Sequence, residues 1–449
     1  MILLFTVFPS CTPKLSPVEI PVEEPQNFSN SGEDLLPDKW WTSFNDPVLD
    51  SLVKKGLEEN LSLAGNLEAY YAALARVQRE NSSLFPQVDV FSGITSRKAQ
   101  TDFSEDFEYR TGFSASYEID LWGRIRAGIQ AEKYTADAIF RDYQAAAMTI
   151  SAEIATTWYQ LVTARRQLEL IDEQIQTNED IVKLIRARFA GGQIRAVDIL
   201  RQEQLLESTR NQKIIYETDL GILENRLAIL LGRPPQNIEN FEQGILPPLP
   251  SPPATGLPME LVRRRPDIQR DYNLLLAADR DMAFAVRSKF PVISLEATGQ
   301  FRAGNFDNLF ENWAYTLAGN LFTPLFYGGR LSAEVDHARA VKNQRLYEYG
   351  QTVLLAFQEV ENSLLRERKQ AERLVVLERQ LDLAQKTSRQ LRISFLNGMS
   401  NYLDVLLALD QQQQLERELL ERKQEQLEIR IGLYRALAGA FELPENNSL

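Results

Sequence analysis

The sequence repeats itself at a nearly fixed offset of 206 positions along most of its length. Gly123-Arg124 recurs as Gly329-Arg330, and Glu153-Ile154 recurs as Glu359-Val360. At the same offset lie Phe189, Gly192 and Asp198 with Phe395, Gly398 and Asp404; the pair Phe85-Pro86 recurs as Phe290-Pro291 at an offset of 205. A register kept across four separated blocks indicates tandem duplication of one structural unit. We therefore expect two halves with the same architecture.

The repeat sets the expected domain boundaries. Leu246 to Pro258 is too rich in proline for a helix or a central strand and is predicted to be a linker. The predicted segments are a signal-like stretch (1–11), a flexible tether (12–37), the first repeat (38–245), the proline-rich linker (246–257), the second repeat (258–441) and a tail (442–449).

Each half contains two segments with the period of two that is typical of strands. Ile293, Leu295 and Ala297 alternate with polar residues, and the stretch from Trp313 to Leu321 does the same. The predicted strands span about 85–96, 110–121, 291–303 and 313–324. Each has about ten residues, which is the length of a tilted strand that crosses a membrane.

Four membrane strands cannot close a barrel by themselves, because about eight is the practical minimum. An open edge in lipid leaves unpaired backbone groups, and each costs several kcal/mol. If the strands lie in a membrane, several copies of the chain must share one barrel, with 8 strands from two copies or 12 from three. Two soluble hairpins on a helical domain remain an equal reading of the pattern alone.

The rest of each half is predicted to be long coiled-coil helices. Ile154, Leu161, Leu168, Ile175, Val182 and Phe189 recur every seven residues, and Leu374 to Phe395 alternates spacings of three and four. A helix of about 65 residues is about 100 Å long. Each ends at a glycine-containing tip, at 190–196 and 397–401, before a second helix returns. Such hairpins cannot bury themselves as a globule and are predicted to be staves of a tube.

Composition excludes several classes of function. The net charge of −13 argues against general nucleic-acid binding, which needs a basic surface. After the N-terminus no apolar run reaches the length of a transmembrane helix. His337, the one histidine, lies in a helical run, and none of the common catalytic or metal-binding motifs occurs. The arginines at 263–265 are read as capping and ion-pairing groups. We expect no enzyme, cofactor or metal site.

Cys11 is the one cysteine, so an intrachain disulfide is excluded. It ends an apolar stretch of the kind that precedes the acylated cysteine of a lipoprotein, and a proline-rich stretch follows it. No Lys or Arg precedes the apolar run, and Phe8 and Pro9 are unusual before such a cysteine. Acylation of Cys11 and an ordinary free thiol both remain open, and we expect acylation.

Several motifs resemble those of the TolC-like outer-membrane efflux factors of the NodT type. They are Trp40-Trp41, Phe44, Asp46-Pro47, Asp120-Leu-Trp-Gly-Arg124, Gly256-Leu-Pro258 and Leu261 to Ile268. The resemblance covers about 38–441. It implies a mainly α fold with a small membrane β part: a homotrimer with a long α-barrel and a shared 12-strand β-barrel in the bacterial outer membrane. It also implies docking to a periplasmic adaptor and an inner-membrane transporter of the RND type.

The resemblance also assigns a periplasmic gate to the tips, formed by Asp198, Asn401, Leu403 and Asp404. Asp198 and Asp404 occupy matching positions and resemble gate aspartates, and Leu403 matches a constricting apolar ring of some members. Leu407 stands where a second aspartate often follows, so a doubled acidic ring is in doubt. A plain capping role is the competing reading, because the helix dipole favours an aspartate in the first turn.

The expected function is thus the passive outer-membrane channel of a tripartite pump that exports drugs or metal ions. The alternatives are the outer-membrane duct of a type I protein secretion system and a structural coiled-coil protein of the envelope. The latter would lack membrane strands. The sequence does not identify the exported molecule, because the transporter selects it.

Overall fold

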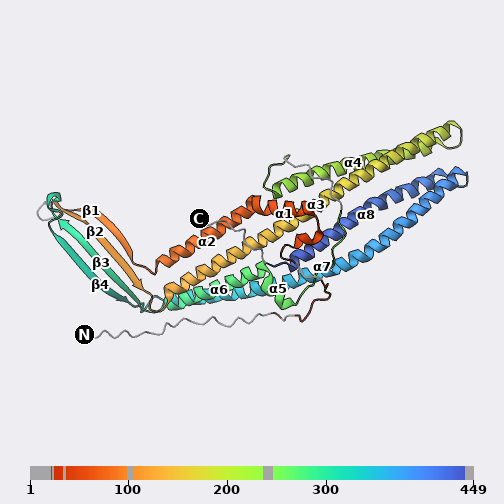
Figure 1. The fold of residues 1–449 in the computed structure, drawn as a ribbon. Coiled ribbons are helices and arrows are strands. Elements are labelled where there is room, and N and C mark those ends of the chain that lie inside the picture. The colour runs from red at the N-terminus through yellow and green to blue at the C-terminus, as the bar shows by residue number, and fades with distance from the viewer. Residues whose placement is uncertain (1–21, 23–24, 34–36, 99–104, 236–245, 440–449) are drawn as a thin grey trace. The chain divides into compact units, whose positions relative to one another are not determined.

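The computed structural model describes residues 22, 25–33, 37–98, 105–235 and 246–439. These residues form two compact units. One unit holds the strands and adjacent helical segments at 66–142 and 267–352; the other holds the described residues of 24–65, 143–266 and 353–449. The prediction of a mainly helical, tandemly repeated chain with four strands is confirmed (Figure 1).

Both halves present the same order of elements, two helices, two strands and two long helices. The first half consists of the 3₁₀ helix η1 (Trp40–Phe44), α1 (Pro47–Glu59), α2 (Leu61–Ser82), β1 (Gln87–Lys98), β2 (Glu105–Ile119), α3 (Arg124–Ala190) and α4 (Ala196–Leu230). The second consists of α5 (Pro258–Arg264), α6 (Pro266–Arg287), β3 (Val292–Ala303), the 3₁₀ helix η2 (Phe306–Asn308), β4 (Trp313–Phe322), α7 (Arg330–Leu396) and α8 (Tyr402–Leu437).

Several strand ends differ from those expected, by two residues at both ends of β1 and at the end of β2, and by more at the start of β2. Strand β2 begins at Glu105, five residues before the predicted start, because its pairing with β1 continues to the end of that strand. The segment is charged, so hydrophobic alternation does not mark it. Strand β4 ends at Phe322 rather than near 324. Pro324 has no backbone N–H to donate, so the ladder ends before it.

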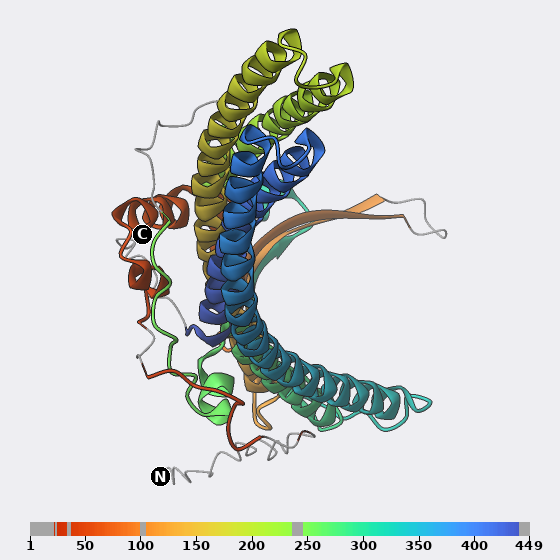
Figure 2. The ribbon, with the colours of Figure 1, turned by 90° about the vertical axis from the view of Figure 1, so that its right-hand side faces the viewer.

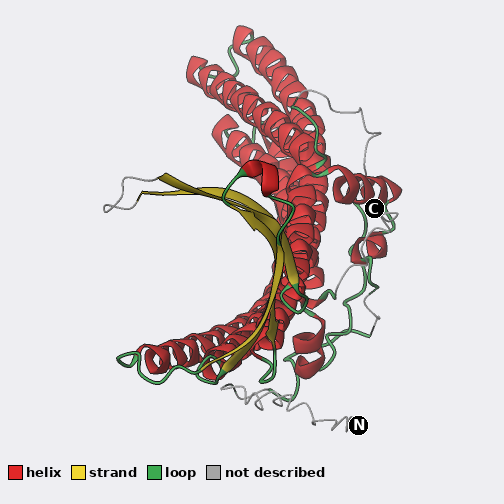
Figure 3. Ribbon diagram, turned by 90° about the vertical axis from the view of Figure 1, so that its left-hand side faces the viewer, coloured by secondary structure: helices red, strands yellow, loops and turns green. Residues whose placement is uncertain are grey.

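The four strands form one antiparallel sheet in the order β1-β2-β3-β4, which curves as a single layer (Figure 3). The register brings apolar residues together on one face, through the pairs Val90↔Phe113, Tyr117↔Leu295 and Ile293↔Leu321. The other face is polar and carries Asp89↔Ser114, Ser116↔Glu296 and Ser294↔Asn320. The apolar face is open to solvent in the single chain, where Val90 is 72% and Leu317 is 75% exposed.

The long helices α3 and α7 each have 67 residues. Helix α3 lies beside α4 and forms the first hairpin, and α7 lies beside α8 and forms the second (Figure 2). No helix among the described residues combines the length and apolar character needed to cross a membrane.

The predicted seam of α7 lies inward, since every residue from Leu374 to Phe395 that belongs to it is buried or half-buried. The seam predicted for α3 is only partly correct. Phe189 is 45% exposed, whereas Ile154 and Leu161 are buried. The fully buried heptad row of α3 lies three residues further along, at Thr157, Ala164, Ile171, Asn178 and Ile185. Two residues of this row, Thr157 and Asn178, are polar, so a search for apolar repeats does not detect the row.

The residues that carry the family resemblance stabilise the ends of elements. Asp46 caps α1 by accepting hydrogen bonds from the N–H groups of Val48 and Leu49, and it also accepts one from Trp158 Nε1 at 2.8 Å. Asp120 accepts from the N–H groups of Ile125 and Arg126 at the start of α3. These carboxylates satisfy N–H groups that a helix leaves without partners in its first turn.

Part of the expected tether is instead held in place. The backbone N–H of Ser29 donates to Glu361 Oε1 at 2.8 Å, and Phe28 packs edge-on against Phe357. Gly32 N–H donates to the carbonyl oxygen of Pro253 at 3.0 Å. A Cβ atom at Gly32 would lie 1.8 Å from a carbonyl oxygen of the linker, so the approach requires glycine. Residues 28–32 are therefore docked, because the linker and α7 pair with their backbone.

Candidate functional site at the two hairpin tips

The tips of the two hairpins have the same backbone conformation. Gly192 and Gly398 have positive φ values of 72° and 74°, which glycine adopts without steric cost. Gly192 N–H donates to Phe189, and Gly398 N–H donates to Phe395 at the matching position. The next residues, Gln193 and Met399, donate to the carbonyls of Arg188 and Ser394, again 206 apart. The repeat thus extends to individual hydrogen bonds, and glycine terminates both long helices.

Asp198, in the first tip, is enclosed by arginines. It occupies the third position of α4 and is 3% exposed. Its carboxylate accepts from Arg195 Nε at 3.2 Å, Arg195 Nη2 at 3.1 Å and the Arg195 backbone N–H at 3.3 Å. Arg201 lies 3.8 Å away on the next turn. The carboxylate is therefore committed to contacts within its own chain.

Asp404, at the matching position of the second tip, has a different environment. Its backbone N–H donates to the side-chain oxygen of Asn401, which caps α8, at 3.1 Å. The side chain is half-buried. Within the described part of the chain, its carboxylate has no hydrogen-bond donor or cation as a partner. Asn401 thus has a capping role, and the Asp404 carboxylate is available to water, ions or another chain.

Tyr402, the first residue of α8, joins the two hairpins. Its hydroxyl donates to Gln202 Oε1 of α4 at 2.6 Å, and its ring packs edge-on against Phe395. Burial raises the pKa of the Tyr402 phenol above its ordinary value, and the negative charge of Asp198 raises it further. The phenol therefore stays neutral and keeps its proton for Gln202.

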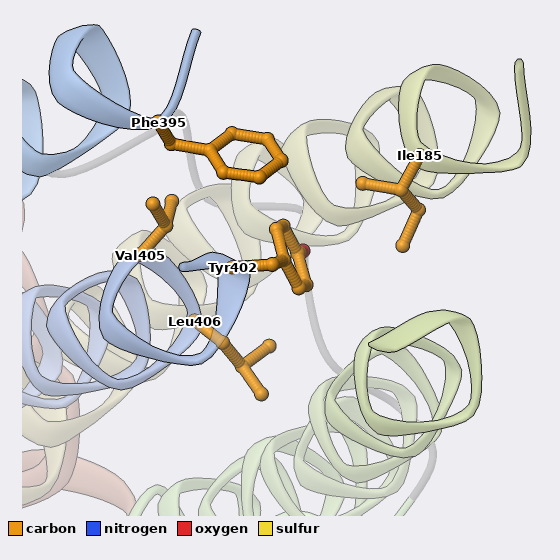
Figure 4. Packing of buried hydrophobic residues seen from close by; sticks show 5 residues of the cluster. All are labelled: Ile185, Phe395, Tyr402, Val405 and Leu406. Atoms are coloured by element: carbon orange, nitrogen blue, oxygen red, sulfur yellow. The ribbon is translucent and has the colours of Figure 1, made fainter. Parts of the chain in front are cut away.

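An apolar cluster surrounds this hydrogen bond. Its side chains point toward one another from α3, α7 and α8 (Figure 4), and its buried members are Ile185, Phe395, Tyr402, Val405 and Leu406. Leu403 is half-buried and packs against this cluster. The contact places Leu403 against the core of the tip, so its position depends on the packing of both hairpins.

Buried amides continue the contact between the hairpins away from the tip. Asn178 Nδ2 donates to Thr209 Oγ1 at 3.1 Å and to Gln413 Oε1 at 3.2 Å. Gln202 Nε2 donates to Asn178 Oδ1 at 3.3 Å, and Gln174 Nε2 donates to the Gln413 carbonyl at 3.2 Å. We call Asn178, Gln202, Gln413 and Tyr402 the polar latch. The polar side-chain groups of the latch can be buried because they are hydrogen-bonded to one another. A buried polar group without such a partner would cost about 1–3 kcal/mol of folding stability.

Sequence reasoning named Asp198, Asn401, Leu403 and Asp404 but missed the polar latch. One signal could have found it: the equivalents of Tyr402, Gln202 and Asn178 in the other half are alanines, at 196, 408 and 384. Where one half has a polar residue and the other half has alanine at the equivalent position, the two halves are expected to make different side-chain contacts. The structure brings Asp198 close enough to Tyr402 for its negative charge to raise the pKa of the Tyr402 phenol, in addition to the larger effect of burial.

The remaining candidates have structural surroundings. His337 is exposed on α7, and the described residues contain no cluster of His, Cys, Asp or Glu suited to a metal ion. Arg265 is 7% exposed and bonds Glu359 at 2.8 Å and the Ala436 carbonyl at 3.2 Å, which fits the ion-pairing role expected for it. Cys11 lies outside the described residues. The tips are thus the candidate site, and the contacts described there hold the helices together.

Comparison with known proteins places both halves in one family. The family model described as outer membrane efflux protein matches residues 52–233 and 257–439. The chain is 28% identical over 429 residues to the pyoverdine export outer membrane protein OpmQ of Pseudomonas aeruginosa, covering 90% of this chain and 88% of that protein. It is 27% identical over 413 residues to nodulation protein T of Rhizobium leguminosarum, covering 88% and 87%. The structure of the outer-membrane channel OprN superposes with a TM-score of 0.88 at 25% identity, covering 95% of this chain and 98% of that one.

Proposed function

Since the chain belongs to the outer membrane efflux protein family, we propose that it is the outer-membrane channel of a tripartite efflux pump. It is a passive exit duct that carries small toxic molecules, drugs or metal ions, from the periplasm to the outside. The observation that carries this function is the family match to both halves. The TolC-like family expected from the sequence motifs is thereby confirmed.

The duct forms from three copies of the chain. A four-stranded sheet with one exposed apolar face and one polar face suits a wall between lipid and water. Four strands cannot close a barrel, whereas three copies supply twelve. OpmQ and OprN, which the chain resembles, are named as outer-membrane proteins.

Exposed apolar residues on α4 and α7 support contact between copies. In an antiparallel pair of helices the numbers of facing residues have a constant sum. Leu200, Ile214 and Ile222 of α4 and Leu396, Leu383 and Val375 of α7 are all more than 40% exposed. The residue numbers of the pairs Leu200 with Leu396, Ile214 with Leu383 and Ile222 with Val375 have nearly the same sum, 596 or 597. Helix α4 of one copy therefore has the spacing to pack along α7 of the next.

The periplasmic gate lies at the tips. Asp404 supplies a carboxylate that no group among the described residues of its own chain neutralises, and Asn401 fixes the start of the helix that carries it. Leu403 adds an apolar constriction, and a dry constriction disfavours the passage of ions. Asp198 is bound by Arg195 and Arg201, so it shapes the first tip.

A periplasmic adaptor and an inner-membrane transporter of the RND type dock to the channel and open it. Cys11 carries the lipid that anchors the chain to the outer membrane. Replacing Cys11 by serine should abolish labelling by a palmitate analogue while the trimer still forms. Undiminished labelling would exclude Cys11 as the lipid site, and unlabelled wild-type protein would return it to a free thiol.

Deletion of the gene tests the function. We expect deletion to raise the cellular accumulation of at least one member of a panel of fluorescent drugs and toxic metal ions, and the wild-type gene to restore export. If accumulation is unchanged and a specific protein disappears from the medium, the chain is instead a type I secretion duct. If the purified protein is monomeric by native mass spectrometry and shows no heat-modifiable migration, a structural envelope protein without a barrel fits better.

A further inference from the structure

Two arginines face each other on the polar side of the sheet. Arg110 of β2 and Arg302 of β3 are direct cross-strand partners. Each lies an even number of residues from a polar-face residue of its own strand, Ser116 or Glu296. Because side chains alternate between the two faces, both arginines project from the polar face. Like charges directly opposite each other destabilise the pairing of two strands, so sheet formation alone does not favour this pair.

Both arginines share one carboxylate. Arg302 Nε and Nη2 lie 3.0 and 2.9 Å from Glu108 Oε1, and Arg110 Nε lies 3.4 Å from the same oxygen. Arg110 Nε is buried and has no hydrogen-bond partner in the described part of the chain. The rest of the pair is open to water, since the Arg302 and Arg110 side chains are 56% and 41% exposed. Two guanidinium groups against one carboxylate leave this cluster with one positive charge.

The sheet leaves space beside the arginine pair. On β1, Gly93 stands directly opposite Arg110. A Cβ atom built on Gly93 would meet nothing within 4 Å, so the polar face is empty at that position. A guanidinium group carries several N–H donors in one plane and binds a carboxylate, phosphate or sulfate group through two of them at once. The residues at this level of the sheet therefore suit an oxyanion.

The other end of the same face is acidic. Asp89 of β1 and Glu296 of β3 are exposed, and neither carboxylate has a cation or a hydrogen-bond donor as a partner among the residues that the structure describes. Glu118 is paired with Arg124 at 2.7 Å. Glu296 and Arg302 are six residues apart on β3, or about 20 Å at about 3.4 Å per residue. This is more than twice the Debye length of about 8 Å at physiological ionic strength, so the two charged zones act on ions separately.

We propose that Arg110 and Arg302 form a binding site for oxyanions at the outer mouth of the duct, with one site in each copy of the chain. The inference rests on the proposed function, since the shared barrel makes the polar face the wall of a duct. The strands join the helices α2, α3, α6 and α7 at their acidic end. The arginine end therefore lies away from the periplasmic helices. The duct attracts cations at the helical end of the barrel and oxyanions at its outer end.

A structural ion pair between β2 and β3 is the competing explanation. Such a pair needs only Arg302 and Glu108, and it leaves the second arginine, directly opposite the first, without a purpose. The two explanations differ most clearly for the loss of the carboxylate. If Glu108 only joins the strands, its removal weakens the sheet and leaves anion binding unchanged. If the arginines bind an oxyanion, its removal strengthens binding, because the like charge beside the ligand is gone.

Block of single channels by inorganic tripolyphosphate in planar bilayers tests the site. The large helical part cannot cross the bilayer when protein is added from one chamber, so the outer mouth faces the other chamber. The test variants are Arg302→Gln, the double variant Arg110→Gln with Arg302→Gln, and Glu108→Gln. Arg339→Gln is the matched control, because it removes one exposed arginine of α7, which pairs with Asp336 outside the sheet.

Tripolyphosphate in the outer chamber should block the wild-type channel. The half-blocking concentration should rise at least about fivefold in Arg302→Gln and at least about tenfold in the double variant, because charge-assisted hydrogen bonds are lost. It should fall about fivefold in Glu108→Gln, since a like charge close to the ligand is removed. Arg339→Gln should stay within about twofold of the wild type, because its charge lies far beyond the Debye length.

The side of addition shows where the oxyanion comes from. In the variant Asp404→Ala with Leu403→Ser, whose tips are expected to be open, tripolyphosphate is also added on the helical side. Block from both sides would support the site and show that it can receive an oxyanion group of an exported solute. Block from the outer side alone would support the site and assign it to anions of the external medium.

Two results would overturn the proposal. Equal half-blocking concentrations in the wild type and the Arg110/Arg302 double variant, in channels of normal conductance, would refute the anion site and leave the proposed function standing. Weaker or unchanged block in Glu108→Gln would favour the structural ion pair. Native mass spectrometry shows whether each variant still forms trimers. Wild-type protein that forms no channels would refute the proposed function, and the anion site with it.

Discussion

The two hairpin tips have the same backbone and different side-chain surroundings. Both long helices end at a glycine with positive φ, and both return helices carry an aspartate in the first turn. Asp198 is 3% exposed and held by Arg195, whereas Asp404 is half-buried and its carboxylate has no partner among the described residues. Duplication has therefore kept the turn and separated the roles of the two carboxylates.

The two tips are also held by different kinds of contact. The first tip is stabilised by ion pairs within its own hairpin. The second tip is held by groups that reach across to the first hairpin, above all Tyr402 and the polar latch. We propose that the second tip can separate from the first hairpin without unfolding, since the polar groups between them can exchange their protein partners for water. The following predictions test this comparison, from the largest expected effect on stability to the smallest.

Replacing Tyr402 by alanine should have the largest effect. It removes a buried ring from the apolar cluster and leaves Gln202 without its donor, so the second tip should lose about 3–5 kcal/mol of local stability. Amide hydrogen exchange in the first turns of α8 would measure the loss. Leu407→Ala, at a residue that is 59% exposed on the same helix, is the control and should cost less than about 0.5 kcal/mol. If Tyr402→Ala and Leu407→Ala cost the same local stability, Tyr402 does not hold the second tip in place.

Replacing Asp198 by alanine should destabilise the first tip by about 1–3 kcal/mol, because the Arg195 N–H and guanidinium lose their acceptor. Asp404→Ala is the matched control, since both residues occupy the third position of a helix and share the favourable helix-dipole term. It should cost less than about 1 kcal/mol. Hydrogen exchange in the first turns of α4 and α8 measures both. If the two substitutions cost the same, the tips do not differ as described.

Alkaline pH should weaken the contact between the hairpins. Because the pKa of Tyr402 is raised in the folded state, the neutral phenol contributes stability below its unfolded pKa of about 10, and this is lost as pH rises above that value. The denaturant midpoint, followed by circular dichroism, should fall more steeply above about pH 10 in the wild type than in Tyr402→Phe. Parallel slopes would show that other groups cause the alkaline loss.

Asp404→Ala should change stability least and ion selectivity most. Three such carboxylates at one mouth attract cations, so the variant should lose cation preference in planar bilayers while its conductance changes little. Adding Leu403→Ser should raise single-channel conductance, because it removes an apolar constriction. A plain capping role predicts unchanged conductance and selectivity in both variants. In that case the constriction lies elsewhere in the tube.

Much of the fold could be predicted because it depends on local patterns. The 206-residue repeat, the alternation in Ile293 to Phe301 and the glycines at 192 and 398 each reflect a backbone requirement that neighbouring residues impose. The candidate site could be predicted only in part. Asp198 and Asp404 were found by their matching positions, and Asn401 was named as part of the gate because it lies close to Leu403, whereas its role as the cap of α8 appears only in the structure. The same matching suggested equal roles, which their surroundings do not support.

What the sequence alone determined is the set of elements and their duplication, since helix period, strand period and turn glycines are properties of short segments. The tertiary structure decided which row of α3 faces inward, because α3 packs against both α4 and α8 and buries Asn178, which is not part of the expected apolar seam. It also decided that Asp198 is enclosed and that Leu403 rests on the cluster around Tyr402. Burial and partners depend on residues about 200 positions away, such as Tyr402 and Gln202, and no local pattern encodes that distance.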